Sequence, residues 1–123
     1  MIVGIGVDVV HVPRLKRWQE ISGLLERYFH EDELTAALEK GNAACLSLAA
    51  RFAAKEAFGK ALGMGLEGIK LKDIMVKNRH NGQPEIVVRG TALTALEKSG
   101  AVTIHLSLTH EKDNAIAMVV LEK

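Results

Sequence analysis

The first residues of the chain constrain its fold most, because small and β-branched side chains alternate there. Residues 2–10 are rich in valine and isoleucine, which predicts a β-strand. Side chains alternate between the two faces of a strand. One face of this strand would be apolar, with Val3, Ile5, Val7 and Val9, and the other would carry Gly4, Gly6 and Asp8. We therefore expect the apolar face to pack into a core while the other face stays open around Asp8.

The rest of the pattern predicts an α+β fold. Helices are expected at residues 13–21, from about residue 31, and at residues 43–62 and 91–98. Strands are expected at residues 69–77, 85–88, 102–108 and 115–121, with turns at 81–82 and 110–114. The long helix at 43–62 is the largest element, so we expect an antiparallel sheet packed on it.

Composition excludes several classes of protein. A chain of 123 residues with 48% hydrophobic residues fits a single domain over residues 1–123. A formal net charge of +1 argues against a nucleic-acid binder with a uniformly basic surface. No segment approaches the roughly 20 apolar residues of a membrane span. The first residues lack a basic region followed by a sustained apolar run, so we expect no secretory signal. We expect a cytoplasmic protein that binds neither nucleic acid nor membrane.

The expected long helix carries four charged side chains between residues 51 and 60. Phe52, Glu56 and Lys60 follow one another at intervals of four residues and share one stripe of the helix. Arg51 and Lys55 form the neighbouring stripe. Taken alone, this spacing favours an exposed Glu56–Lys60 salt bridge, worth only about 0.2–0.5 kcal/mol.

Asp8 favours a binding site instead. A carboxylate that follows Gly-x-Gly on an apolar strand has no structural task, and burying it without a partner is costly. Mg²⁺ prefers one or two protein carboxylates, several waters and substrate phosphates. Asp8 and Glu56 are therefore candidate ligands of Mg²⁺, with Arg51, Lys55 and Lys60 placed to neutralise phosphate charge. Spacing alone does not bring the two carboxylates together.

Two segments resemble the motifs of holo-acyl-carrier-protein synthases, members of the 4′-phosphopantetheinyl transferase superfamily. Residues 4–14, Gly-Ile-Gly-Val-Asp-Val-Val-His-Val-Pro-Arg, are similar to the opening motif of that family. Residues 51–63, Arg-Phe-Ala-Ala-Lys-Glu-Ala-Phe-Gly-Lys-Ala-Leu-Gly, are similar to its second motif. Weaker matches lie at residues 81–84 and 107–110, and the length of the chain is that of the family.

The resemblance implies a reaction and its residues. Members transfer the phosphopantetheine arm of coenzyme A to a serine of apo acyl carrier protein in fatty acid biosynthesis, releasing adenosine 3′,5′-bisphosphate. Asp8 and Glu56 would hold Mg²⁺ on the pyrophosphate of coenzyme A, and Lys60 would act at the reacting phosphate. The base that activates the serine of the carrier could be Glu56, a metal-bound water or a histidine, and the sequence does not choose between them.

Further residues are implied at the coenzyme A site. Arg51 and Lys55 are candidates for its phosphates, and Gly63 and Gly65 for close approach of the backbone. Two histidines are candidates for cofactor or reacting groups, and each is equally compatible with an ordinary surface role: His105 and His110. His11 departs from the family, which commonly has glutamate there.

The resemblance also implies partners. Arg14 and Arg17 belong to a basic helix start suited to an acidic carrier protein, although a solvated helix face would look the same. The family suggests a homotrimer with its site between subunits, which no periodicity in the sequence shows.

Three other functions fit parts of the sequence. An RNase H-like nuclease or phosphohydrolase also has an aspartate on its first strand, but that chemistry usually needs more carboxylates. A non-catalytic coenzyme A-binding module would share the phosphate-binding residues. A dinucleotide-binding motif fits least, because the third glycine is missing after Gly4 and Gly6.

Overall fold

The computed structural model describes residues 1–123. Its helices and strands follow one another as β1 (Ile2–His11), α1 (Val12–Gln19), α2 (Leu24–Tyr28), α3 (Glu31–Leu38), α4 (Ala44–Ala61), β2 (Ile74–Asn78), β3 (Pro84–Val88), α5 (Gly90–Ser99), β4 (Thr103–Glu111) and β5 (Asn114–Glu122). Short 3₁₀ turns at Gly41–Ala43 and Leu71–Asp73 precede α4 and β2. None of the helices combines the length and hydrophobicity needed to cross a membrane.

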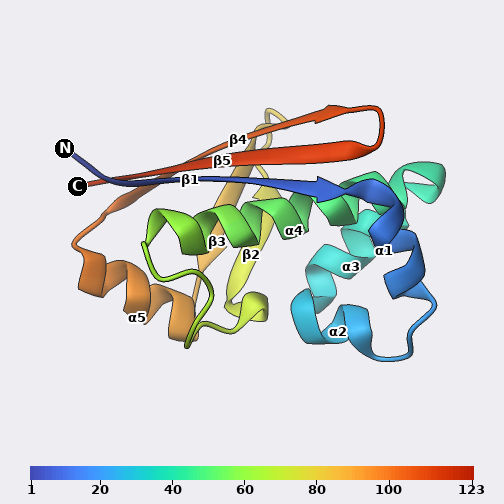
Figure 1. The fold of residues 1–123 in the computed structure, drawn as a ribbon, viewed down its shortest axis with the longest axis horizontal. Coiled ribbons are helices and arrows are strands. Elements are labelled where there is room, and N and C mark those ends of the chain that lie inside the picture. Colours follow the sequence, from blue (N-terminus) through green and yellow to red (C-terminus); the bar gives the residue numbers. More distant parts are fainter.

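Two antiparallel sheets and one central helix organise the molecule. The larger sheet has the strand order β1-β5-β4, and β2 and β3 form a separate hairpin. Helix α4 runs along one face of the larger sheet, while α1, α2 and α3 gather near the start of α4 (Figure 1). This arrangement confirms the expected α+β fold with an antiparallel sheet packed on one long helix.

The face of β1 that packs against α4 is the glycine face, so the expected orientation of this strand was wrong. Gly6 is buried, whereas Ile5, Val7 and Val9 are each more than half exposed. A side-chain carbon added at Gly6 would lie 1.9 Å from the carbonyl oxygen of Ala57. The helix backbone thus occupies the space that a larger side chain on this face would need, and the β-branched residues point outward.

The outward face of the sheet continues this apolar surface across β5. Strand register places Val7 opposite Met118, Ile5 opposite Val120 and Val9 opposite Ile116, as the antiparallel pairing requires. Met118 is 46% exposed, and no other element of the chain covers these strands on this side (Figure 1). The molecule therefore presents an uncovered apolar sheet face, which is called the outer face below.

Two element boundaries and one additional helix differ from the sequence-based expectation. Strand β2 begins at Ile74 because the preceding residues form the 3₁₀ turn, so 69–77 was too long for a strand. The last hairpin turns tightly over Lys112 and Asp113, where Lys112 has a φ of 44°. His110 consequently belongs to strand β4 and not to an open hairpin tip. Helix α2 was not expected from the sequence.

The contact between β1 and α4 yields a stability prediction. Gly6→Ala should lower the free energy of unfolding by about 3 kcal/mol, because the new methyl group meets backbone and not a movable side chain. Gly23→Ala is the matched control: its φ of 80° makes alanine strained by roughly 1–2 kcal/mol, but nothing lies within 4 Å of the added carbon. Urea denaturation of both variants measures the difference. Equal losses would contradict the close packing of β1 on α4.

Candidate active site

Asp8 and Lys60 meet where the edge of β1 passes the end of α4. The Lys60 ammonium donates hydrogen bonds to Asp8 Oδ1 at 2.9 Å and to the carbonyl oxygen of Val7 at 3.1 Å. The side chain of Lys60 is 52% exposed and that of Asp8 is 17% exposed. Lys60 thus pairs with Asp8, and the Glu56–Lys60 salt bridge expected from helix spacing does not form, because the ammonium group reaches across to β1 instead.

Glu56 joins this cluster from α4. Partial burial raises the pKa of Glu56, and the nearby negative charge of Asp8 raises it further, while Lys60 and Arg14 act in the opposite direction. The fold therefore brings together the two carboxylates that the sequence could not place. Asp8, Glu56, Lys60 and Arg14 are called the carboxylate cluster below.

The carboxylate cluster suits a hard divalent cation that also binds phosphate. A cation between two carboxylates lowers their electrostatic repulsion. Mg²⁺ needs no more than one or two protein carboxylates. The chain offers no group of three or more histidine, cysteine, aspartate or glutamate side chains that could hold a metal ion. An ion held by this pair would keep open positions for phosphate oxygens and water.

Lys55 lies away from the cluster, in the interior. It has no exposed surface, and its ammonium group donates to Glu33 Oε1 at 2.7 Å and to the carbonyl oxygens of Leu71 and Ile74. Burial lowers the pKa of Lys55, and the attraction of Glu33 opposes that change. All three donors are used inside the protein, so the structure assigns Lys55 to the core and not to a coenzyme A phosphate.

Glu33 is the buried carboxylate that sequence reasoning missed. Its side chain caps the start of α3 by accepting a hydrogen bond from the His30 backbone at 3.1 Å, and it also accepts one from the Val76 backbone. The side chain of His30 completes the capping box by accepting from the Asp32 backbone. A capping box is readable from sequence, but the pairing of Glu33 with Lys55 depends on the tertiary fold.

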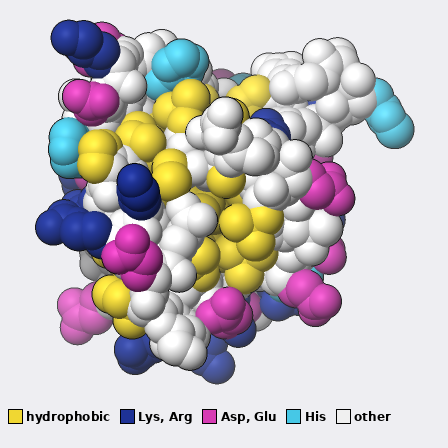
Figure 2. Space-filling view, turned by 90° about the vertical axis from the view of Figure 1, so that its right-hand side faces the viewer, with side chains coloured by type: hydrophobic (Ala, Val, Ile, Leu, Met, Phe, Trp, Pro, Cys, Tyr) yellow, Lys and Arg dark blue, Asp and Glu magenta, His cyan; other side chains and the backbone are white.

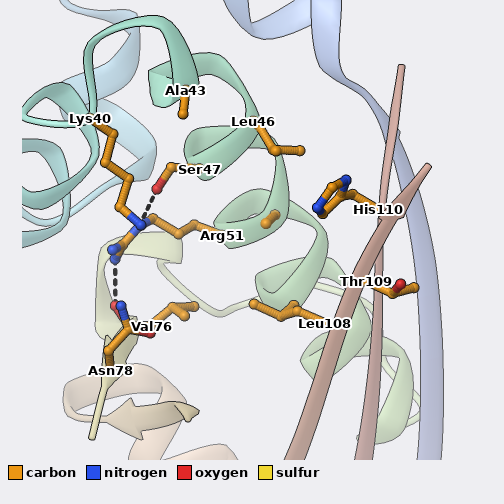
Figure 3. A pocket seen from close by; sticks show the side chains of 11 residues that line it. Lys40, Ala43, Leu46, Ser47, Arg51, Val76, Asn78, Leu108, Thr109 and His110 are labelled. Atoms are coloured by element: carbon orange, nitrogen blue, oxygen red, sulfur yellow. Dashed lines mark hydrogen bonds between the residues drawn. The ribbon is translucent and has the colours of Figure 1, made fainter. Parts of the chain in front are cut away.

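Arg51 lies beside this buried pair and lines a cavity of about 240 Å³ (Figure 3). Its guanidinium group donates to Ser47 Oγ and to the carbonyl oxygen of Val76, and it lies 3.8 Å from Glu33 Oε2. The cavity walls come from α4, β2, β4 and the segment 40–43 that precedes α4. Their polar members are Lys40, Ser47, Arg51, Asn78, Thr109 and His110. Two predicted site residues, Arg51 and His110, thus share one cavity.

The Arg51–His110 cavity and the carboxylate cluster lie at opposite edges of the three-stranded sheet. Asp8 is on β1 and His110 is on β4, with β5 between them. Neighbouring strands lie about 5 Å apart, so the two edges are separated by roughly 10 Å, and α4 packs beneath them. One chain therefore carries two separate groups of polar residues, one near each edge of the sheet.

The other predicted residues are dispersed. His105 projects from the outer face of β4, where its Nε2 lies 2.9 Å from Glu122 Oε1, and the His105–Glu122 contact lowers the pKa of Glu122. Gly63 and Gly65 form the loop after α4 with φ of 78° and 62°. Arg17 is exposed on α1.

Charge on the α1–α3 end of the molecule is mixed. Figure 2 shows this end, where positive and negative side chains surround a central hydrophobic area. No uniformly basic surface is present there, in keeping with the net charge of +1. Recognition of an acidic partner on this end would therefore rely on individual cations such as Arg14 and not on a broad positive field.

Comparison with known proteins gives a consistent result. A family model described as the 4′-phosphopantetheinyl transferase superfamily matches residues 4–119. The chain is 56% identical over 122 residues to the holo-[acyl-carrier-protein] synthase of Treponema denticola, covering 99% of both chains. It is 43% identical over 122 residues to the corresponding synthase of Treponema pallidum, covering 99% of this chain and 97% of the other.

Solved structures agree with these sequence matches. The crystal structure of holo-[acyl-carrier-protein] synthase from Neisseria meningitidis superposes with a TM-score of 0.91 at 35% identity, covering both chains completely. A synthase from Bacillus anthracis, solved in complex with CoA (3′,5′-ADP), gives a TM-score of 0.83 at 35% identity, covering 99% of this chain and 97% of the other. The similarity thus extends over the whole fold.

The interior position of Lys55 leads to a second stability prediction. Lys55→Met should lower the free energy of unfolding by about 3–5 kcal/mol, because the Glu33 carboxylate loses its partner in the core. Lys60→Met is the matched control, and it should cost less than about 1 kcal/mol because Lys60 is half exposed. Chemical denaturation compares the two. A Lys55→Met protein as stable as Lys60→Met would show that the buried pair does not hold the core.

Proposed function

Because this chain belongs to the 4′-phosphopantetheinyl transferase superfamily, we propose that its carboxylate cluster is the site of phosphopantetheine transfer. The chain transfers the 4′-phosphopantetheine group from coenzyme A to a serine of apo acyl carrier protein. The observation that supports the location is the meeting of Asp8, Glu56 and Lys60 at one exposed rim.

We propose that Asp8 and Glu56 hold Mg²⁺ on the pyrophosphate of coenzyme A. Their oxygen donors and mutual repulsion fit this ion, as does the small number of protein ligands. When bound, the ion would neutralise phosphate charge and orient the pyrophosphate for attack. The remaining steps belong to side chains of the protein and of its partner.

Lys60 is the residue placed to act on the leaving group. The serine oxygen of the carrier forms a bond to the phosphorus next to pantetheine, and the bond from that phosphorus to the departing adenosine 3′,5′-bisphosphate breaks. Lys60 is half exposed and adjoins Asp8, so its ammonium group can neutralise charge on the departing phosphate or donate a proton to it.

Glu56 is our candidate for the base that accepts the serine proton. Glu56 projects from α4 into the carboxylate cluster that contains Lys60, so its own chain places it beside the reacting phosphate. The two histidine candidates lie elsewhere in the chain, His105 on the outer face and His110 at the opposite sheet edge. Neither belongs to the carboxylate cluster of its own chain.

We further propose a homotrimer in which each site combines two chains. The carboxylate cluster of one copy would face the Arg51–His110 cavity of the next, whose cationic and polar groups suit the nucleotide phosphates. The uncovered outer face, with Val7 and Met118 at its centre, supplies apolar surface for such an assembly. The Gly63–Gly65 loop is our candidate for close approach of the protein backbone to coenzyme A.

The carrier protein and the cellular compartment complete the proposal. Arg14 belongs to the carboxylate cluster and Arg17 follows it on α1, and we propose that they bind acidic groups of the carrier protein. The reaction would take place in the cytoplasm, where coenzyme A and the carriers of fatty acid biosynthesis are found.

One incubation tests the reaction and the position of its site. The protein is mixed with coenzyme A, Mg²⁺ and an apo acyl carrier protein, and the carrier is weighed by mass spectrometry. The carrier should gain one phosphopantetheine group, and the gain should disappear with a chelator or with Asp8→Ala, and fall at least about 100-fold in rate with Lys60→Ala.

Three results would argue against this proposal. An unchanged carrier mass, with coenzyme A still bound, would indicate a non-catalytic binding module. Release of nucleotides from a nucleic acid would indicate a nuclease. Full activity of the Asp8→Ala variant would show that the active site does not include Asp8.

The same assay tests the shared site. Asp8→Ala and His110→Ala damage different half-sites, so each variant alone should be impaired in every site. Co-expressed, they should regain activity because some interfaces combine two intact halves. A co-expressed mixture no more active than the variants alone would place the complete site within one chain.

A further inference from the structure

Arg14 is a cation of the carboxylate cluster without a protein partner. It takes part in none of the ion pairs of the chain, although it lies near the acid Glu56. Its Nε is buried and has no hydrogen-bond partner. A guanidinium group left in this state normally costs stability, so other contacts must hold it in place.

Two aromatic rings supply those contacts. The guanidinium carbon of Arg14 lies 5.0 Å from the ring centroid of Trp18 and 5.6 Å from that of Phe52, both within the range of cation–π attraction. Trp18 and Phe52 themselves pack edge to face, with centroids 4.9 Å apart. The two rings therefore make a preformed seat for one arginine.

The positions of these residues follow from helix geometry. Arg14 and Trp18 are four residues apart on α1, and Phe52 and Glu56 are four residues apart on α4, so each pair shares one side of its helix. Helices α1 and α4 pack together, which sets the seat one helical turn from Glu56. Arg14 is close enough for its charge to oppose the rise in the Glu56 pKa that burial and Asp8 cause.

We propose that Trp18 is a positioning residue for the carrier: with Phe52 it holds the Arg14 guanidinium ready for an acidic group of the incoming acyl carrier protein. This inference rests on the proposed function. An arginine side chain loses considerable rotamer freedom when it is fixed, so fixing it before binding lowers the cost of association. Arg14 extends from a helix whose last turn carries exposed Lys16 and Arg17, which favours an acidic protein over a free phosphate as its partner.

The test separates positioning from packing. Trp18→Leu removes the ring that faces Arg14, and Trp18→Phe restores an aromatic ring. Tyr28→Leu is the matched control, because Tyr28 packs on Trp18 and Phe52 at 5.4 and 5.9 Å without forming a cation–π contact with Arg14. Each variant is measured for thermal stability, for the Kd of apo acyl carrier protein by calorimetry, and for the KM of coenzyme A.

Trp18→Leu should raise the carrier Kd about five- to tenfold and leave the coenzyme A KM unchanged. Trp18→Phe should stay within about twofold of the wild type. Tyr28→Leu should lower the melting temperature but not the affinity for the carrier. In an Arg14→Ala background, Trp18→Leu should add nothing, because the two residues act as one unit.

Four outcomes would overturn this role of Trp18. If Trp18→Leu and Tyr28→Leu weakened carrier binding equally, the Trp18 ring would contribute only packing and not the positioning of Arg14. If Trp18→Leu changed only the KM of coenzyme A, Arg14 would bind the phosphates of coenzyme A and not the carrier. If Trp18→Leu still weakened carrier binding in the Arg14→Ala background, Trp18 would not act through Arg14. If the wild type bound no carrier, the acyl carrier protein would not be the partner of this site. If the carrier bound but no phosphopantetheine were transferred, the proposed function would be contradicted, but the role of Trp18 in positioning Arg14 would not.

Discussion

The close approach of helix α4 to the glycine face of β1 is the contact on which the rest of the structure depends. Alanines on the helix and glycines on the strand let the two backbones come nearer than ordinary side chains would allow. Asp8 is the next residue on that same face, so the contact carries it directly to the helix. Lys60 and Glu56 then meet Asp8 because they project from the helix at that edge.

The same helix distributes its other charges by their angular positions. Lys55 points into the core and forms its ion pair with Glu33, whereas Arg51 lines the cavity at the β4 edge. Four charged residues within ten positions thus belong to the core, the carboxylate cluster and the Arg51–His110 cavity. A buried ion pair of this kind is expensive to break, so it fixes the rotation of α4 and with it the directions of Arg51 and Glu56.

Much of this fold could be predicted from the sequence. Periodicity located β1, α4 and the final hairpin, because alternation and helix-forming residues are strong there. The orientation of β1 was not predictable from hydrophobicity, since its apolar side chains face outward and the space beneath Gly6 is taken by helix backbone. The family motifs supplied Asp8, Glu56 and Lys60 but could not show that Lys55 is internal, because its partner Glu33 is 22 residues away. The aromatic seat of Arg14 likewise required the packing of α1 on α4.

The central claim is that Asp8 and Glu56 repel each other until a cation joins them, and melting curves of Glu56→Gln test it most directly. Burial, and then the charge of Asp8, raise the pKa of Glu56 in the folded protein, so the stability cost of ionising Glu56 is absent at low pH and is complete once the pH has risen through the raised pKa. Without metal, Glu56→Gln should therefore melt above the wild type at pH 8 and equal it at pH 4. With Mg²⁺ and coenzyme A, the wild type should gain stability and the variant should not. A variant that melts lower without metal at pH 8, or gains equally from Mg²⁺, would contradict a metal-holding carboxylate pair.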